Sequence, residues 1–300
     1  MPSMKDIRRK ISSTKNTQQI TKAMKMVSAA KLRRAQTSIV AARPYAYKIH
    51  SVISKLVAGG EYSHPLLTTE PKSAGKILLV VLTSDRGLCG AFNGNIIKFA
   101  DRFYKENKEK HEAIDFIFVG RKANDYFKKR NVTVIETITN LANEIKFSMA
   151  LELSEKIMKD FEEGSYDKVV VVYNEFKSAI SQKVISEQLL PVTPMSRMEM
   201  AQSVEDGEKA DPEISGDYIF EPAPNLILSS LVPKHFAIQI YRAMLESVAS
   251  EHGARMSAMD GATRNAGQMI RKLTLTYNKL RQAAITKELM EIVSGAEALK

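Results

Sequence analysis

Two stretches of helical periodicity, one at each end of the chain, constrain the fold most strongly. Residues 234–300 contain no proline, and small or apolar residues recur there at steps of three, four or seven. Such a series keeps one face of a helix against a partner helix. An unbroken helix of this length would extend for roughly 100 Å, so we expect it to project from the core. The series comprises Tyr241, Leu245, Val248, His252, Met259, Ala262, Ala266, Met269, Leu273 and Leu280.

The first 58 residues supply a second helix. Ser3 followed by Asp6 is typical of a helix start, and the next proline is Pro44, which we expect to bend the helix. Two series step by three and four, and the nine-residue interval between them predicts that the contact face shifts around the helix. They are Ile20, Ala23, Val27, Ala30 and then Ile39, Ala42, Ala46, Ile49, Ile53, Leu56. Either stripe alone is typical of a bundle helix, but one at each end favours an antiparallel coiled coil of residues 1–58 and 225–300.

Positive charge is concentrated in residues 1–58. This segment holds thirteen Lys and Arg against the single acid Asp6, a net charge of +12, whereas the whole chain carries +10. A helix with so few acids repels itself, so we expect an acidic partner. An acidic protein surface and a nucleic acid both fit, although the segment has no aromatic residue before Tyr45 and no nucleic-acid-binding motif.

Composition narrows the class of protein. The chain is 44% apolar, which is normal for a globular protein. It has neither an apolar run near the roughly 18 residues that span a membrane nor a signal peptide, so we expect a soluble protein. The single cysteine, Cys89, excludes an internal disulfide, and the five scattered histidines lack the spacing of a zinc site. We therefore expect no metal and no cofactor.

Residues 75–190 alternate between strand and helix patterns, which predicts a small Rossmann-like α/β domain with a mostly parallel sheet. The expected strands are 77–83, 115–119, 132–135 and 168–173, with 183–190 as an edge strand, and the expected helices are 93–108, 121–129 and 145–161. Residues 191–224 contain five prolines among many acids, which indicates a loop or hinge region.

A glycine-containing turn, TSDRGLCGAFN at residues 83–93, follows the first expected strand. Strand-to-helix turns of α/β folds often bind phosphate, but Gly87 and Gly90 fit neither the dinucleotide nor the P-loop spacing. Cys89 as a nucleophile would need a base, and the sequence places no histidine beside it. The alternative is that the glycines shape the turn while Cys89 packs as a small apolar residue.

Three segments of the chain resemble the gamma-subunit family of F-type ATP synthases. They are residues 4–36, residues 82–93 (LTSDRGLCGAFN) and residues 250–299, and they occur in the family's order along the chain. The resemblance implies a central rotor whose terminal helices form a coiled coil inside a ring of three alpha and three beta subunits. One copy would turn with a membrane ring of c subunits, contact the epsilon subunit, and drive the beta sites, where ATP is made. The chain itself would be no enzyme.

The same resemblance implies contact residues. Those facing the alpha and beta subunits would be Met24, Arg255, Arg281, Gln282, Thr286 and Glu288, and those facing the c ring and epsilon would be Tyr218 and Glu221. For Met24 and Thr286, simple packing in the helix seam is an alternative. Membrane association would come only through the complex, on the cytoplasmic face of a bacterial inner membrane. Because Cys89 has no second cysteine beside it, thiol regulation is not predicted.

Two other classes also fit part of the sequence. A basic α/β protein that binds nucleic acid would explain the charge of the first helix, and its affinity would fall steeply with salt. A cysteine- or nucleotide-dependent enzyme would explain the glycine-containing turn. The family resemblance leaves the acidic segment 195–217 without an assignment.

Overall fold

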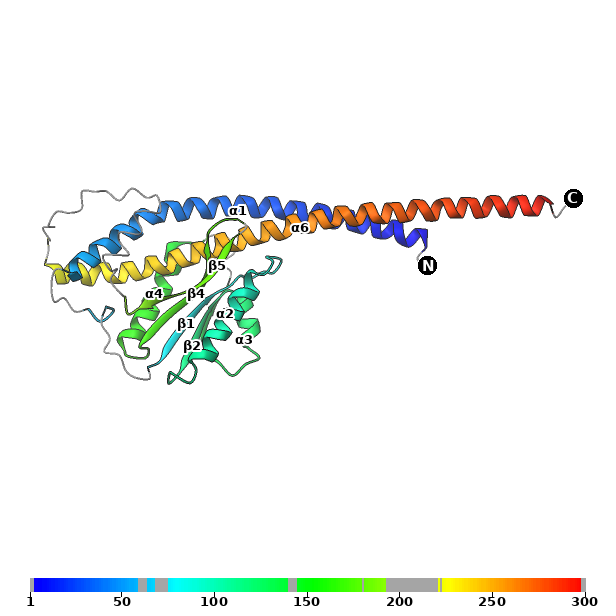
Figure 1. Cartoon of the computed structure of the whole chain (residues 1–300). Coiled ribbons are helices and arrows are strands. Elements are labelled where there is room, and N and C mark those ends of the chain that lie inside the picture. The colour runs from blue at the N-terminus through cyan, green and yellow to red at the C-terminus, as the bar shows by residue number, and fades with distance from the viewer. Residues whose placement is uncertain are drawn as a thin grey trace. The chain divides into compact units, whose positions relative to one another are not determined.

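The computed structural model describes residues 3–58, 64–67, 75–139, 145–179, 181–192, 221 and 223–297, and Figure 1 labels its main helices and strands. The chain divides into two compact units. Unit 1 comprises Met1–Ala30 and Arg255–Lys300, and unit 2 comprises Lys31–Ala254. Each unit has its own set of packing contacts.

Both expected terminal helices are confirmed, and each supplies residues to both units. Helix α1 is Met4–Ala58 and helix α6 is Pro224–Glu297. Pro44 lies inside α1 and Pro233 inside α6, and neither ends its helix. An internal proline removes a backbone hydrogen bond, so other contacts must hold these helices together across the proline.

The face of α1 that is shielded from solvent differs from the expected one. Ile20 and Val27 were predicted to lie in the seam, but they are 60% and 58% exposed. The predicted phase shift between Ala30 and Ile39 is also wrong, because polar and small residues carry an unbroken repeat of four and three. The buried or half-buried positions of this repeat are Ile7, Ile11, Thr14, Gln18, Thr21, Lys25, Ser28, Leu32, Ala35, Ile39, Ala42, Ala46, Ile49, Ile53 and Leu56.

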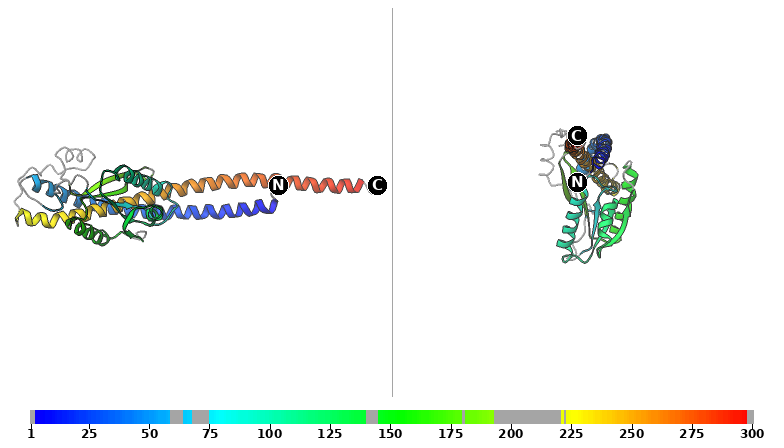
Figure 2. Two further views of the ribbon diagram at one scale, coloured as in Figure 1. Left: turned by 90° about the horizontal axis from the view of Figure 1, so that it is seen from below. Right: turned by 90° about the vertical axis from the view of Figure 1, so that its right-hand side faces the viewer.

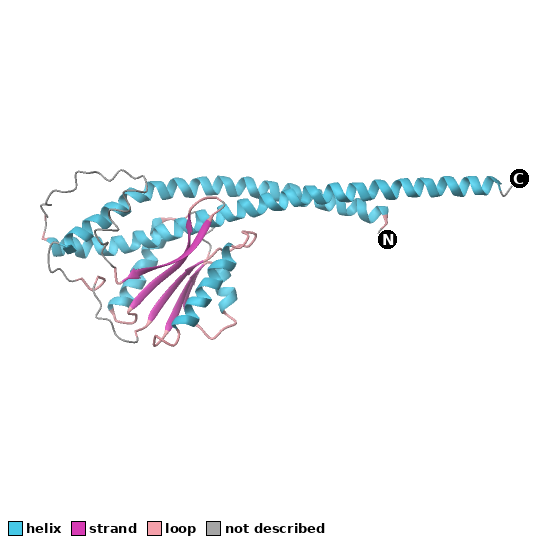
Figure 3. Cartoon of the chain, viewed as in Figure 1, coloured by secondary structure: helices cyan, strands magenta, loops and turns pink. Residues whose placement is uncertain are grey.

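Unit 2 contains a five-stranded sheet in the order β3-β2-β1-β4-β5, shown in magenta in Figure 3. The strands are β1 Ile77–Leu82, β2 Ile114–Val119, β3 Thr133–Ile138, β4 Lys168–Phe176 and β5 Gln182–Leu190. β1 pairs in parallel with β2 and β4, β2 pairs in parallel with β3, and β5 is antiparallel to β4. The predicted mostly parallel sheet with a fifth strand at its edge is confirmed.

A fully buried strand was easier to locate from the sequence than a half-buried edge strand. Every residue of β1 is buried, as its continuous apolar run predicts for a central parallel strand. The edge strand β3 was expected at residues 132–135 but ends at Ile138, after a register shift against β2 between Phe116 and Ile117. Its second half is Glu136, Thr137 and Ile138, two polar residues and one apolar residue at half-buried positions, so a search for apolar runs stops short.

Helices cover both faces of the sheet. Helices α2 (Phe92–Asn107) and α3 (Arg121–Phe127) pack on one face, around Phe116 and Phe118. Helix α4 (Phe147–Glu162) packs on the other face, together with residues of α1 and α6 that belong to unit 2. The end-on view in Figure 2 shows the teal α2 and the green α4 on opposite sides of the sheet. The three expected helices are confirmed, with ends that differ by one or two residues.

Candidate functional site

Within unit 1, side chains of α1 and α6 that lie far apart in sequence meet. The hydroxyls of Thr21 and Thr263 are 2.8 Å apart, and Gln18 Nε2 donates to the carbonyl of Thr263 over 3.4 Å. Lys25 Nζ lies 2.5 Å from Asp260 Oδ1. Because residue numbers rise along α1 while those of its partners fall along α6, the two helices run antiparallel. The predicted antiparallel pairing is confirmed in this unit.

Small residues let these helices approach closely. Ser28 and Ala266 are each less than a tenth exposed, as is the larger Met259. A Cβ atom added at Gly267 would lie only 3.0 Å from Nε2 of Gln18. The seam therefore combines small and polar groups with a few larger apolar side chains such as Met259, and it leaves Ile20 and Val27 of α1 outside.

The start of α1 is closed by a reciprocal pair of hydrogen bonds. The Asp6 backbone N–H donates to Ser3 Oγ over 3.2 Å, and the Ser3 hydroxyl donates to Asp6 Oδ2 over 2.7 Å. The hydrogen bonds that the Ser3 hydroxyl and the Ser3 backbone N–H donate to Asp6 Oδ2 hold the pKa of the Asp6 carboxyl below its usual value. The start signal that Ser3 and Asp6 gave in the sequence is confirmed, and it fixes where the basic helix begins.

No helix in the described part of the chain covers the last turns of α6. Figures 1 and 2 show α6 continuing past the N-terminal end of α1. Between residues 281 and 295 every described side chain except Ala284 is exposed. Several of these are large and apolar: Ile285, Leu289, Met290, Ile292 and Val293, each at least half exposed. An apolar surface of this kind marks an interaction site.

The sequence reasoning missed this apolar set. Ile285, Leu289 and Ile292 step by four and three, starting five residues after Leu280, the last member of the predicted series. The signal was therefore present in the sequence. In this part of α6 the apolar pattern no longer indicates packing against α1, because α6 continues past the N-terminal end of α1.

The structure places most of the predicted contact residues. Arg281, Gln282, Thr286 and Glu288 are exposed on this end of α6. Two turns separate Arg281 from Glu288, so these two side chains share one face with Ile285. Met24 is half-buried near the seam, and Arg255 is 9% exposed, so the chain itself already packs around it.

Of the two residues predicted to contact the c ring and the epsilon subunit, the structure describes only one. Glu221 is exposed. Tyr218 and the acidic segment 195–217 lie outside the described residues.

The first half of α1 also presents an exposed basic surface. Lys5, Arg8, Arg9, Lys10, Lys15 and Lys22 are all exposed. Ile20, Met26 and Val27 are exposed beside them. The outer side of α1 therefore offers positive charge together with apolar area.

The turn after β1 is held by its own side chains. Asn93 Nδ2 donates to Ser84 Oγ at 2.8 Å and to Cys89 Sγ at 3.1 Å, and the Ser84 N–H donates to Asn93 Oδ1 at 2.9 Å. Leu88 and Gly90 have φ values of 63° and 58°, which a tight turn requires. Cys89 is 2% exposed and packs against the α2 face of the sheet. The arrangement favours the interpretation of Cys89 as a packing residue.

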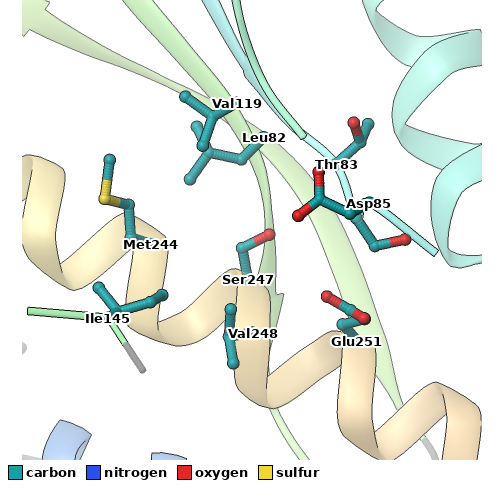
Figure 4. Close-up of a pocket in the computed structure, with 10 residues that line it drawn as sticks. Leu82, Thr83, Asp85, Val119, Ile145, Met244, Ser247, Val248 and Glu251 are labelled. Carbon is teal, nitrogen blue, oxygen red and sulfur yellow. The ribbon is translucent and has the colours of Figure 1, made fainter. Parts of the chain in front are cut away.

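A small pocket lies beside this turn, at the carboxyl end of β1, where α/β folds often bind ligands. Figure 4 shows Thr83 and Asp85 on the strand side, and Ser247 and Glu251 on α6. Its volume of about 20 Å³ holds a single water molecule. Two carboxylates on its wall also disfavour a phosphate group. This pocket cannot serve as a nucleotide site.

Among the described residues, no three His, Cys, Asp or Glu side chains gather where they could hold a metal ion. No helix in the described part of the chain is long and apolar enough to cross a membrane.

Comparison with known proteins gives full-length matches. A family model described as ATP synthase matches residues 3–299. The chain is 55% identical over 300 residues to the ATP synthase gamma chain of Bdellovibrio bacteriovorus, and 47% identical over 301 residues to that of Geotalea daltonii. Both matches cover 100% of each chain.

Solved structures give the same match. The chain resembles one from the central stalk and c ring of the Tetrahymena thermophila mitochondrial ATP synthase, with a TM-score of 0.58 and 29% identity, covering 81% of this chain and 99% of that one. A chain of the Euglena gracilis mitochondrial enzyme shares the fold, with a TM-score of 0.65 and 24% identity, covering 99% of this chain and 94% of the other.

Proposed function

Since this chain belongs to the ATP synthase gamma-chain family, and is thus a non-catalytic central-stalk subunit of an ATP synthase, we propose that it couples ion-driven rotation of a membrane c ring to ATP synthesis on the beta subunits. In the reverse direction, ATP hydrolysis on the beta subunits would drive the rotation.

The observation that carries this proposal is the unpartnered end of α6. Exposed apolar side chains cover residues 285–293 on a helix that has no α1 beside it, and they are accompanied by the charged residues Arg281 and Glu288. An isolated helix end of this composition gains stability only when another surface covers it. A ring of alpha and beta subunits around it supplies such a surface.

We infer the stator contacts from the exposure of this helix end. Arg281, Gln282, Thr286 and Glu288 contact loops of the beta subunits around the end of α6. Met24 and Arg255 act beside the seam, at half-buried and buried positions. The exposed basic residues of α1 face acidic loops of the same ring, because opposite charge favours that contact.

The other end of the rotor meets the membrane sector. Tyr218 and Glu221 contact the c ring and the epsilon subunit, and the chain is held at the cytoplasmic face of a bacterial inner membrane only through these partners. Residues 1–58 and 225–300 form the shaft, residues 75–190 form the domain beside it, and residues 191–224 connect the two.

Copurification tests the assembly. Expressed with alpha and beta subunits, the chain is expected in a complex with one copy per three alpha and three beta subunits, measured by native mass spectrometry. Removing residues 281–300, which include the uncovered helix end, should weaken retention of the chain in high salt. A wild-type chain that stays monomeric in the presence of alpha and beta subunits contradicts the proposal.

A further inference from the structure

Within unit 2, a cluster of polar side chains joins helix α6 to the sheet. Glu187 of β5 accepts hydrogen bonds from two neighbours. The Tyr173 hydroxyl on β4 donates to its Oε2 over 2.9 Å, and Arg242 Nη2 on α6 lies 2.6 Å from Oε1 and 2.7 Å from Oε2. One carboxylate therefore ties β4 and β5 to α6. Figure 1 labels these three elements.

The environment of this cluster keeps its hydrogen bonds formed. Tyr173 is 1% exposed, and burial raises the pKa of its hydroxyl far above the physiological range, with the nearby Glu187 and Glu246 carboxylates adding to the shift. The Arg242 guanidinium partly opposes that shift. The phenol thus remains a donor. The side chains of Glu187 and Arg242 are about one-third exposed, so solvent weakens this ion pair in part.

A second polar attachment lies two turns farther along α6. The Ser250 hydroxyl donates to the Asn174 carbonyl of β4 over 3.0 Å, and both residues are buried. Next to it, Gly253 approaches so closely that an added Cβ would lie 3.2 Å from the Ala179 carbonyl oxygen. Eight residues separate Arg242 from Ser250, or about 12 Å along a helix. The helix is therefore fixed to β4 and β5 at two levels.

Hydrogen bonds and apolar packing differ in which movements of a helix on a sheet they oppose. Burial of apolar area is non-directional, so it holds a helix on a sheet without fixing its rotation or its position along its axis. Hydrogen bonds depend on direction, and polar groups in an interface fix its register. In a subunit that transmits torque, the force between α6 and the α/β domain tends to rotate or slide the helix on the sheet.

We propose that Glu187, Tyr173 and Arg242 form a torque clamp, a set of positioning residues that holds the shaft helix α6 against the α/β domain under load. This inference rests on the proposed rotor function. The clamp does not touch the catalytic sites, and its loss loosens the domain on the shaft while ATP turnover without load continues.

The test uses the purified ATP synthase complex, held by its alpha and beta subunits, with a bead attached through a cysteine placed at the exposed Lys98 of α2. Torque from the beta sites then crosses the clamp before it reaches the bead. With rotation stalled, the variance of the bead angle reports how stiff that path is. In Arg242→Leu we expect the variance to rise by about twofold at an unchanged ATPase rate.

Two further variants separate the clamp from general stability. A single nitrogen of Arg242 makes both contacts to Glu187, so Arg242→Lys, which keeps one charged nitrogen, should retain most of the stiffness. The control is Lys156→Leu, which removes the ion pair between Lys156 of α4 and Glu136 of β3, the strand at the opposite edge of the sheet from β5. It should leave the variance unchanged even if Tm falls.

The angular variance of the bead decides whether the clamp exists. A wild-type variance in Arg242→Leu, or an equal rise in Lys156→Leu, overturns the clamp. If Arg242→Leu does not assemble, Tyr173→Phe removes only one hydroxyl and should raise the variance by a smaller amount; an unchanged variance then overturns the proposal. A wild-type bead that does not rotate on addition of ATP would instead refute the rotor function.

Discussion

Lys25 of α1 and Asp260 of α6 form an ion pair across the seam of unit 1, with Nζ 2.5 Å from Oδ1, although 235 residues separate them in sequence. Arg264 adds a second contact to Oδ2 of the same carboxylate at 3.2 Å. A charged residue thus occupies a position of the α1 repeat that coiled coils usually fill with apolar side chains. Such a residue specifies register at some cost in stability.

The ion pair predicts a pH dependence of stability. The hydrogen bond from Lys25, followed by the charges of Lys25 and Arg264, holds the pKa of Asp260 below its ordinary value of 3.8. A lowered folded pKa means that the stabilisation is complete above the unfolded pKa and is lost as the pH falls through the folded one. Asp260→Asn should therefore be less stable than wild type at neutral pH, by a margin that disappears in acid. Urea unfolding at a series of pH values measures this margin.

The matched control is Arg264→Gln, which removes only the contact within α6. It should change stability less than Asp260→Asn at neutral pH, because its side chain is 73% exposed. Equal effects of the two variants would show that the contact across the seam contributes nothing.

A substitution at Gly120 tests the packing at the end of β2. Gly120 has a φ of 102°, and an added Cβ would lie 2.1 Å from the Thr83 carbonyl oxygen. Neither the backbone conformation nor the space admits a side chain. We expect Gly120→Ala to lower the free energy of unfolding by about 3 kcal/mol, as measured by urea denaturation.

Gly94→Ala provides the comparison for Gly120→Ala. Gly94 lies in α2 with no atom within 4 Å of an added Cβ, so stability should stay the same or rise by a few tenths of a kcal/mol. If both alanine variants unfolded at the same urea concentration, the steric argument would be wrong.

The proposed beta contacts predict a coupling defect. Arg281→Ala combined with Glu288→Ala should leave the complex assembled but reduce ATP-driven rotation by about tenfold, equivalent to roughly 1.4 kcal/mol, because charged interface groups lose their partners. Rotation speed of single complexes measures the effect.

Its control is the double variant Lys287→Ala and Glu291→Ala, which removes an exposed pair 3.5 Å apart on the same helix and changes charge by the same amount. This control should rotate at nearly the wild-type rate. Similar losses in both double variants would leave the assignment of Arg281 and Glu288 without support.

The packing role of Cys89 predicts that its thiol is dispensable. In Cys89→Ser a hydroxyl can still accept the hydrogen bond from Asn93 Nδ2, so ATP turnover by the complex should be unchanged and Tm should fall only slightly. Because Cys89 is 2% exposed, alkylation by iodoacetamide should be slow in the native chain and rapid after unfolding. Loss of ATP turnover in the serine variant would revive the possibility of a catalytic thiol.

Local sequence patterns were enough to predict the helices and strands and their order along the chain. The continuous apolar run of β1 fixes a buried parallel strand, and the Ser3–Asp6 start and the long proline-free stretch predict the terminal helices. The sequence also supplied the resemblance that named Arg281 and Glu288, and it placed the basic charge on the first helix. These signals are local or compositional, so one chain read from end to end contains them.

Which face of each helix packs inside the chain could be read only from the folded structure. Ile20 and Val27 suggested a seam, yet they are exposed, and Thr21 and Ser28 are buried in their place. Apolar residues of a subunit serve both its own core and its partners, and the hydrophobic effect makes no distinction between the two. Position against a specific neighbour, such as Asp260 beside Lys25 or Glu187 beside Arg242, arises from residues far apart in sequence, and therefore only the folded chain shows it.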